Sequence, residues 1–158
     1  MKFSTLATTL GLTAQATALG RAVVHNNCPD PVYLWSVGGA VGPRQTLLAN
    51  EIYSEDVHHD DASGGVALKI TRSPDGLWDG SAQTNFAYSL TGDRVWYDLS
   101  NVFGAPFEGD ALTVMSDDPS CESICWADGV NPGGNHVKDC SAEATEVLTL
   151  CAGYCSAT

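Results

Sequence analysis

Short runs of alternating apolar and polar residues, separated by clusters of Gly, Pro, Asn and Asp, dominate this chain of 158 residues. In the clearest run, 66–71, the apolar Val66, Leu68 and Ile70 occupy every second position. Such alternation is typical of a strand with one buried face. No stretch beyond residue 18 keeps the i, i+3, i+4 spacing of an amphipathic helix. The pattern therefore predicts an all-β domain, built as a sandwich or a barrel.

The most informative stretch is 86–104, where two runs of β-branched and aromatic residues flank Thr-Gly-Asp at 91–93. Gly92 can supply the positive φ that a tight connection needs, so the stretch predicts a β-hairpin. Apolar residues occupy every second position of both strands, namely Phe86, Tyr88, Leu90, Val95, Tyr97 and Leu99. Trp96 and Asp98 then point the opposite way, and we expect them side by side on an exposed face.

Further strands are expected at 32–37, 52–54, 112–114 and 147–151. The run 32–37 is apolar on both faces, which predicts a strand covered on both sides, with Trp35 buried or half-buried. We expect an acidic, histidine-containing loop at 55–61 and another loop at 77–84. From Asp117 the chain is expected to be loop-like until the closing strand.

The first 18 residues have the features of a secretory signal peptide: Lys2, a short apolar run, and Ala-Thr-Ala at 16–18. The run is too short and too rich in Thr to span a bilayer, which needs about 20 apolar residues. We expect cleavage after Ala18, which leaves residues 19–158 as one secreted domain, long enough to bury a sizeable core.

The charge balance excludes some classes of partner. The whole chain has a formal net charge of −12, and without Lys2 it has six basic and 19 acidic residues, a net charge of −13. Nucleic acids and anionic membranes bind clusters of Lys and Arg, so neither is an expected partner. We also expect no cofactor and a monomeric protein.

Six cysteines lie beyond the signal peptide, at Cys28, Cys121, Cys125, Cys140, Cys151 and Cys155. An even number in a secreted chain predicts a disulfide framework without a free thiol, and the sequence alone leaves 15 connectivities open. A zinc site is the alternative, but the Cys-x2-Cys pairs typical of such sites are absent.

A set of motifs covers most of residues 19–158. They are Arg-Ala-Val-Val-His-Asn-Asn-Cys at 21–28, Gly-Pro-Arg-Gln at 42–45, Ser-Gly-Gly-Val at 63–66, the hairpin's Tyr-Asp-Leu-Ser at 97–100, and Leu-Thr-Leu-Cys at 148–151. In this order they resemble the thaumatin-like proteins. The likeness is most specific to short fungal secreted proteins with the yeast-phase-specific (Bys-type) domain, which share 33–37, 63–66, 95–100 and 132–134.

The resemblance implies a small thaumatin-like β-sandwich stapled by disulfides. It also implies a bridge between the cysteines of the first and last strands, Cys28 and Cys151. In the chain-entropy model, a disulfide that closes so long a loop stabilises the folded state by roughly 4–5 kcal/mol. Cys121 with Cys140, and Cys125 with Cys155, are then the expected remaining pairs. The protein would be extracellular or associated with the cell wall, and would act by binding, as a candidate antigen or effector.

Larger thaumatin-like proteins that cleave β-1,3-glucan have an acidic cleft of one Arg, one Glu and several Asp. Arg72 and Asp98 match two of these positions, whereas Ala87 and Phe103 stand where two acids would be. Glycoside hydrolysis needs two carboxyl groups roughly 5–9.5 Å apart. We therefore expect no enzymatic activity; the alternative, residual glucanase activity, would need a second acid from among Asp79, Asp93 and Glu108.

Two candidate sites remain. Trp96, Trp78 and Tyr97 near Asp98 could form a platform for a sugar ring, with Arg72 as a further binding residue. Alternatively, Trp96 packs under the acidic loop as a small satellite core. The expected partners are a cell-wall polysaccharide or a host surface or apoplastic protein.

The other candidate site is His58-His59-Asp60-Asp61, whose imidazoles and carboxylates are ligands that transition metals accept. Adjacent residues in a strand point to opposite faces, and acids in a loop are usually solvated. These four residues are the weaker candidate, and they leave a secreted metal-binding protein as a further alternative.

Overall fold

The structure is a computed structural model that describes residues 18–155. The expected signal peptide, apart from its last residue, lies outside the described residues. Residues 18–155 form strands and loops, and no helix among them is long and apolar enough to cross a membrane.

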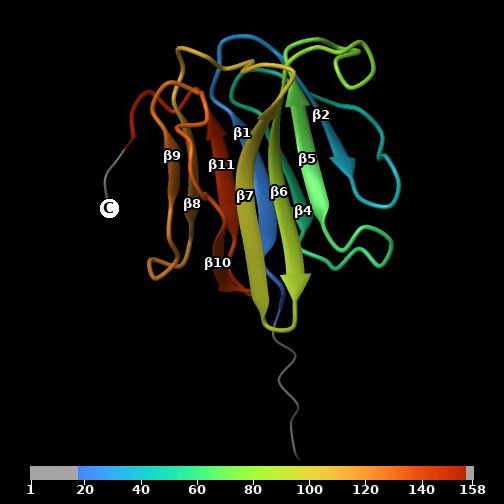
Figure 1. The fold of residues 1–158 in the computed structure, drawn as a ribbon, viewed down its shortest axis with the longest axis vertical. Coiled ribbons are helices and arrows are strands. Elements are labelled where there is room, and N and C mark those ends of the chain that lie inside the picture. The colour runs from blue at the N-terminus through green and yellow to red at the C-terminus, as the bar shows by residue number, and fades with distance from the viewer. Residues whose placement is uncertain (1–17, 156–158) are drawn as a thin grey trace, which may run out of the picture.

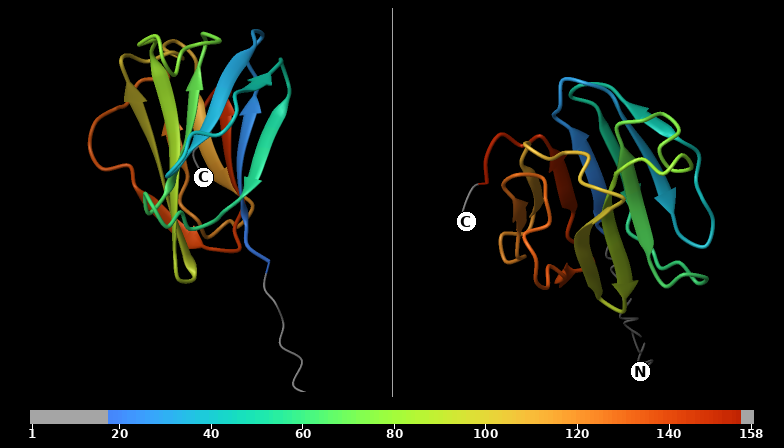
Figure 2. Two further views of the ribbon diagram at one scale, coloured as in Figure 1. Left: turned by 90° about the vertical axis from the view of Figure 1, so that its right-hand side faces the viewer. Right: turned by 45° about the horizontal axis from the view of Figure 1, so that its top comes forward.

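Two sheets pack face to face (Figures 1 and 2). The five-stranded sheet has the order β4-β1-β11-β8-β9. Its strands are β1 (Arg21–Asn26), β4 (Ile52–Asp56), β8 (Leu112–Ser116), β9 (Ile124–Trp126) and β11 (Glu146–Leu150). The six-stranded sheet has the order β10-β7-β6-β5-β2-β3. Its strands are β2 (Val32–Val37), β3 (Gln45–Leu47), β5 (Val66–Thr71), β6 (Gln83–Thr91), β7 (Arg94–Val102) and β10 (Lys138–Ser141). The predicted all-β, disulfide-stapled sandwich is confirmed.

The core lies between the two sheets and is made by the alternating apolar residues of their strands. Leu68 and Phe86 face it from the six-stranded sheet, and Val24 and Leu148 face it from the five-stranded sheet, all with no exposed surface. The period of two in the sequence therefore identified these buried faces correctly. Trp35 follows the core-facing Leu34 on β2 and is buried outside the core cluster, on the opposite face of the sheet, as expected for a strand covered on both sides there.

The predicted hairpin is β6 and β7, which pair from Gln83 opposite Val102 to Thr91 opposite Arg94. Gly92 has φ 62° in the two-residue turn, where the sequence required a positive φ. Cross-strand pairs place Asp98 opposite Ala87 and Trp96 opposite Ser89.

Three local predictions were wrong in part. Glu55 and Asp56 lie in β4, because that strand continues along β1 beyond Ser54. Gln83 and Thr84 already belong to β6, because they pair with the end of β7. The segment after Asp117 contains β9, which pairs with β8, and β10, which pairs with β7. These two strands are short, and distant partners stabilise them rather than any local pattern.

The disulfides join Cys28 to Cys151, Cys121 to Cys140, and Cys125 to Cys155, which are the three expected pairs. All six cysteines lie in the described part of the chain and none is free. The first bridge lies just beyond β1 and β11, which are parallel neighbours. The second bridge links β10 to the segment between β8 and β9, and the third links β9 to the residues after β11.

Candidate functional site

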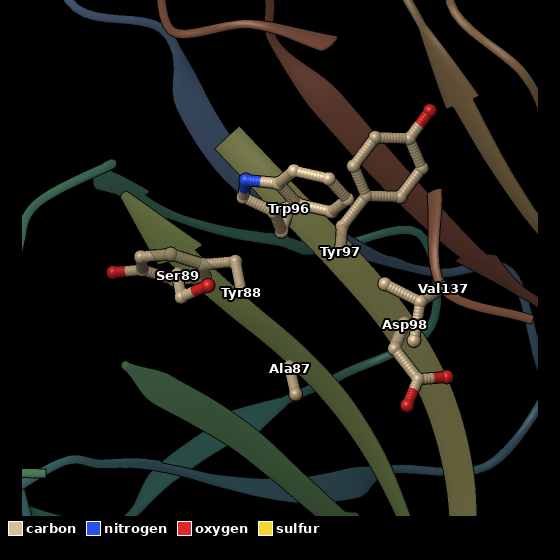
Figure 3. Close-up of a pocket in the computed structure, with 7 residues that line it drawn as sticks. All are labelled: Ala87, Tyr88, Ser89, Trp96, Tyr97, Asp98 and Val137. Carbon is tan, nitrogen blue, oxygen red and sulfur yellow. The ribbon is translucent and has the colours of Figure 1, made fainter. Parts of the chain in front are cut away.

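The outer face of the six-stranded sheet, which is the face turned away from the five-stranded sheet, carries a shallow hollow of about 210 Å³. Trp96 and Asp98 of β7 line it together with Ala87 and Ser89 of β6, and Val137 closes one side just before β10 (Figure 3). The hollow therefore contains the two residues that the hairpin pattern singled out.

The position of Trp96 and Asp98 follows from the alternation along β7. Val95, Tyr97 and Leu99 are buried in the core, so the residues between them must point outward. At Trp96 the strand is paired on both sides, with β6 and with β10. Trp96 is 42 % exposed, and Asp98 is half-buried. A rigid sheet thus presents one indole and one carboxylate on the same side.

Burial in the hollow raises the pKa of Asp98 above its ordinary value, because the charged form loses solvent. The backbone N–H of Leu99 and the nearby charge of His136 lower the pKa in part. Among the described residues Asp98 takes part in no salt bridge. No cationic side chain among the described residues therefore lies within salt-bridge distance of its carboxylate.

Asp139 is a residue of this face that the sequence reasoning missed. It lies on β10, directly opposite Trp96. Trp96 therefore has two acidic neighbours on this face, Asp139 on the adjacent strand and Asp98 two residues further along β7. Its carboxylate accepts hydrogen bonds from the Arg94 guanidinium, with Nε at 2.8 Å. No local signal reveals this neighbour, because 41 residues separate Asp98 from Asp139 in the chain and only sheet pairing brings them together.

Arg72 does not belong to this site. It lies just beyond β5 on the side of the sheet that faces the core, whereas Asp98 points outward. The Arg72 Nε donates to the Pro106 carbonyl at 2.8 Å, and its guanidinium lies 4.8 Å from the centre of the Phe107 ring. The guanidinium also forms a salt bridge with Asp110 at 3.1 Å and lies 3.8 Å from the Cys151 sulfur. Arg72 therefore ties the six-stranded sheet to the loop after β7.

The expected three-aromatic platform is not assembled. Trp78 is 71 % exposed, but it lies in the loop that leads into the start of β6. Ser89, the partner of Trp96, is six residues further along that strand, or about 20 Å. Tyr97 is buried in the core, where its hydroxyl donates to the Glu122 carbonyl. Trp96 is too exposed to form a satellite core, so Trp96 and Asp98 stand as the candidate pair.

The three acids considered as a second catalytic carboxylate also lie away from the hollow. Asp79 accepts hydrogen bonds from Ser73 and Ser81 within its own loop. Asp93 lies in the hairpin turn, and Glu108 lies in the connection between β7 and β8. None of them lines the hollow.

The two histidines of the proposed metal cluster make separate contacts. The Nδ1 of His58 lies 3.1 Å from the Tyr88 hydroxyl, whereas the Nδ1 of His59 lies 3.1 Å from the Leu90 carbonyl oxygen. Each imidazole is oriented by a different residue of β6, so the two rings do not share a ligand geometry.

The two aspartates of that cluster also act apart. Asp60 accepts hydrogen bonds from the backbone N–H groups of Gly39 and Ser63 and from the Ser63 hydroxyl. The Ser63 hydroxyl is the main cause that lowers the Asp60 pKa to about 2. Asp61 is exposed. In the described chain, three potential metal ligands come together at Asp118, Cys121 and Cys140, and the two cysteines there are joined in a disulfide.

Sequence comparisons place the chain beside secreted fungal proteins. The family model described as Blastomyces yeast-phase-specific protein (Bys1) matches residues 9–152. An antigenic thaumatin-like protein of Arthroderma benhamiae is 32% identical, over 88% of this chain and 74% of that protein. The secreted thaumatin-like protein calA of Emericella nidulans is also 32% identical, over 93% of this chain and 92% of that protein.

Solved structures show the same architecture. The protein elicitor MoHrip2 from Magnaporthe oryzae superposes with a TM-score of 0.69 at 29% identity, covering 84% of this chain and 99% of that one. The thaumatin-like xylanase inhibitor TLXI gives a TM-score of 0.55 at 12% identity, with 82% and 98% coverage, a likeness of fold alone.

Proposed function

Because this chain belongs to the Blastomyces yeast-phase-specific (Bys1) family of fungal thaumatin-like proteins, and is secreted, we propose that it acts by binding and not by catalysis. The proposed binding surface is the hollow of Trp96 and Asp98. The proposed partners are a cell-wall polysaccharide or a host surface protein, and the strong negative charge argues against nucleic acid.

One observation carries the proposal: Asp98 is the single carboxylate that lines the hollow. The residue directly opposite it on β6 is Ala87. Phe103, where the family's cleft would have another acid, lies beyond the end of β7 and is 73 % exposed. A lone carboxylate can accept hydrogen bonds from a ligand, but it cannot supply both the acid and the base of glycoside hydrolysis.

The exposed indole supports the binding role. An indole on a rigid sheet offers a flat apolar face together with one N–H donor, which suits it to contact a ligand that has both an apolar face and a hydrogen-bond acceptor. The relatives described as antigenic and as an elicitor also favour a protein whose surface meets other molecules.

A second candidate function is residual hydrolysis of β-glucan, and one observation favours it. Asp139 stands diagonally across from Asp98 on the same face, and diagonal neighbours in a sheet are about 7–8 Å apart, within the range of an acid and a base. Against it, Asp139 is already bound by Arg94. We therefore rank hydrolysis below binding.

The experiment compares the native protein with Trp96→Ala, and uses Trp78→Ala as the matched control, since Trp78 is an exposed tryptophan away from the hollow. Binding to insoluble chitin, β-glucan and host wall fractions is measured together with release of reducing sugar. We expect binding that Trp96→Ala weakens roughly tenfold and Trp78→Ala leaves unchanged, since an aromatic contact contributes about 1 kcal/mol or more. Sugar release that disappears in Asp98→Asn or Asp139→Asn would establish hydrolysis instead. Equal binding by all variants would remove the hollow as the site.

A further inference from the structure

We propose that the hollow binds an amino sugar, the glucosamine unit of a deacetylated chitin-type polysaccharide. The sugar ring would lie against Trp96, and its ammonium group would bind the Asp98 carboxylate. This inference rests on the proposed function, because it assigns a ligand class to the same site.

The negative charge of Asp98 favours a cationic ligand. Asp98 is half-buried and has no salt-bridge partner among the described residues, while Asp139 on the other side of Trp96 is paired with Arg94. The net charge of −12 gives a cationic ligand a favourable approach. A half-buried carboxylate without a partner gains more from an ammonium than from a neutral hydroxyl, because charge-assisted hydrogen bonds are roughly twice as strong.

The shape of the site favours a sugar ring over a peptide. The floor strand β6 is hydrogen-bonded on both sides, to β5 and to β7, so a peptide cannot add to it as a further strand. The surface that remains consists of side chains: the small Ala87 and Ser89, the apolar Val137 and the indole (Figure 3). A rigid ring with a flat C–H face and one cationic group matches this set, and its ordering costs less entropy than that of a flexible lysine side chain.

The polar groups of the site also favour the free amine over its acetylated form. An ionised carboxylate is only an acceptor, so Asp98 cannot satisfy the carbonyl of an acetamido group. The lining also includes Tyr88 and Tyr97, but their hydroxyls already donate to Glu55 and to the Glu122 carbonyl. This leaves the Ser89 hydroxyl and the indole N–H as the side-chain donors of the hollow. A neutral β-1,3-glucan would leave the carboxylate with hydroxyl partners alone.

The test is calorimetric titration of the intact secreted protein with hexasaccharides of glucosamine, of N-acetylglucosamine and of β-1,3-linked glucose, and with a lysine hexapeptide. The variants are Trp96→Ala, Asp98→Asn, and Asp61→Asn as the matched control, which removes the same charge from an exposed loop. Thermal unfolding checks that each variant is folded. We expect the glucosamine oligomer to bind at least about tenfold more tightly than the other three, and Asp98→Asn to weaken it about tenfold. Asp61→Asn should leave that affinity unchanged.

The other outcomes separate this inference from the proposed function. Equal binding of neutral or acetylated oligomers, lost in Trp96→Ala but not in Asp98→Asn, would overturn the amino sugar and keep the binding site. Equally tight binding of the lysine peptide that depends on Asp98 would point to a protein partner and overturn the sugar. An equal loss of glucosamine binding in Asp61→Asn and Asp98→Asn would reduce the effect to net charge and overturn the assignment. If Trp96→Ala changes the affinity for none of the ligands, both the binding role of the hollow and its assignment to an amino sugar are wrong.

Discussion

Glu146 shows how one buried side chain couples this fold to pH. It lies on the core side of β11 with 2 % of its surface exposed, and neither carboxylate oxygen has a hydrogen-bond partner within the described residues. Burial is the main cause that raises its pKa to about 7, with further contributions from the negative charges of Asp117 and Asp118. The nearby Ser116 hydroxyl lowers the pKa in part.

We expect the free energy of unfolding to fall as the pH rises from 4.5 to 7. Below 4.5, the usual value for a glutamate, folded and unfolded chains both hold the proton; between 4.5 and 7 only the folded chain keeps it, so rising pH favours unfolding. The contribution of this group is roughly 3 kcal/mol at most. Denaturant unfolding of Glu146→Gln across this range should show a flatter pH dependence, with Glu143→Gln as the exposed control. An unchanged slope in Glu146→Gln would contradict the assignment.

The backbone of Phe103 is a second feature of a single residue that affects stability. Its φ of 61° lies in the left-handed region, which costs most residues other than glycine roughly 1–2 kcal/mol, and its exposed ring recovers little of this by burial. We expect Phe103→Asn to raise the stability by about 0.5–1 kcal/mol, because asparagine tolerates this conformation. The thermal midpoint measures the effect, and a lower midpoint would mean that the Phe103 ring makes a stabilising contact.

At the scale of elements, a partly buried polar network joins β4 to β6. The Glu55 carboxylate of β4 accepts hydrogen bonds from the hydroxyl of Tyr53, at 2.6 Å, and from that of Tyr88 on β6, at 2.5 Å. Burial first, and then the Glu55 carboxylate, raise the pKa of Tyr88, so its hydroxyl stays protonated as a donor. The network thus joins an edge strand of the five-stranded sheet to the centre of the six-stranded sheet.

Tyr88→Phe should therefore destabilise the protein by about 1–2 kcal/mol, because it leaves a partly buried carboxylate with one donor fewer. Tyr154→Phe, at a residue that is 75 % exposed, is the matched control and should have no effect. Urea unfolding of both variants measures the difference. Equal stability of the two variants would show that water replaces the lost donor.

At the scale of the whole molecule, the disulfides differ in the length of chain that they close. Cys28 and Cys151 are 123 residues apart, whereas Cys125 and Cys155 are 30 apart. The chain-entropy estimate makes the longer loop more stabilising by roughly 1 kcal/mol. Replacing the first pair by serine should lower the stability more than replacing the second, as measured by denaturant unfolding. Equal losses would mean that strain or residual unfolded structure outweighs loop entropy.

The sequence determined the features that depend on neighbouring residues. The alternation in β5, β6 and β7 predicted which faces are buried, and Gly92 predicted the turn, because strand period and turn geometry are local properties. The motif resemblance added the family and the cysteine pairs. The alternation along β7 also placed Trp96 and Asp98 side by side, since residues two apart in a strand share a face.

Tertiary structure alone decided which distant residues share a surface. Arg72 and Asp98 both match the family's cleft, yet the structure does not bring them together. Asp98 points outward from β7, whereas Arg72, just beyond β5, is held by Pro106, Phe107 and Asp110. Asp139 joins Trp96 only through the pairing of β10 with β7, and the polar sequence of β10 carries no strand signal. Contacts across a sheet arise from pairing between segments far apart in the chain, and local patterns do not encode that choice of partner.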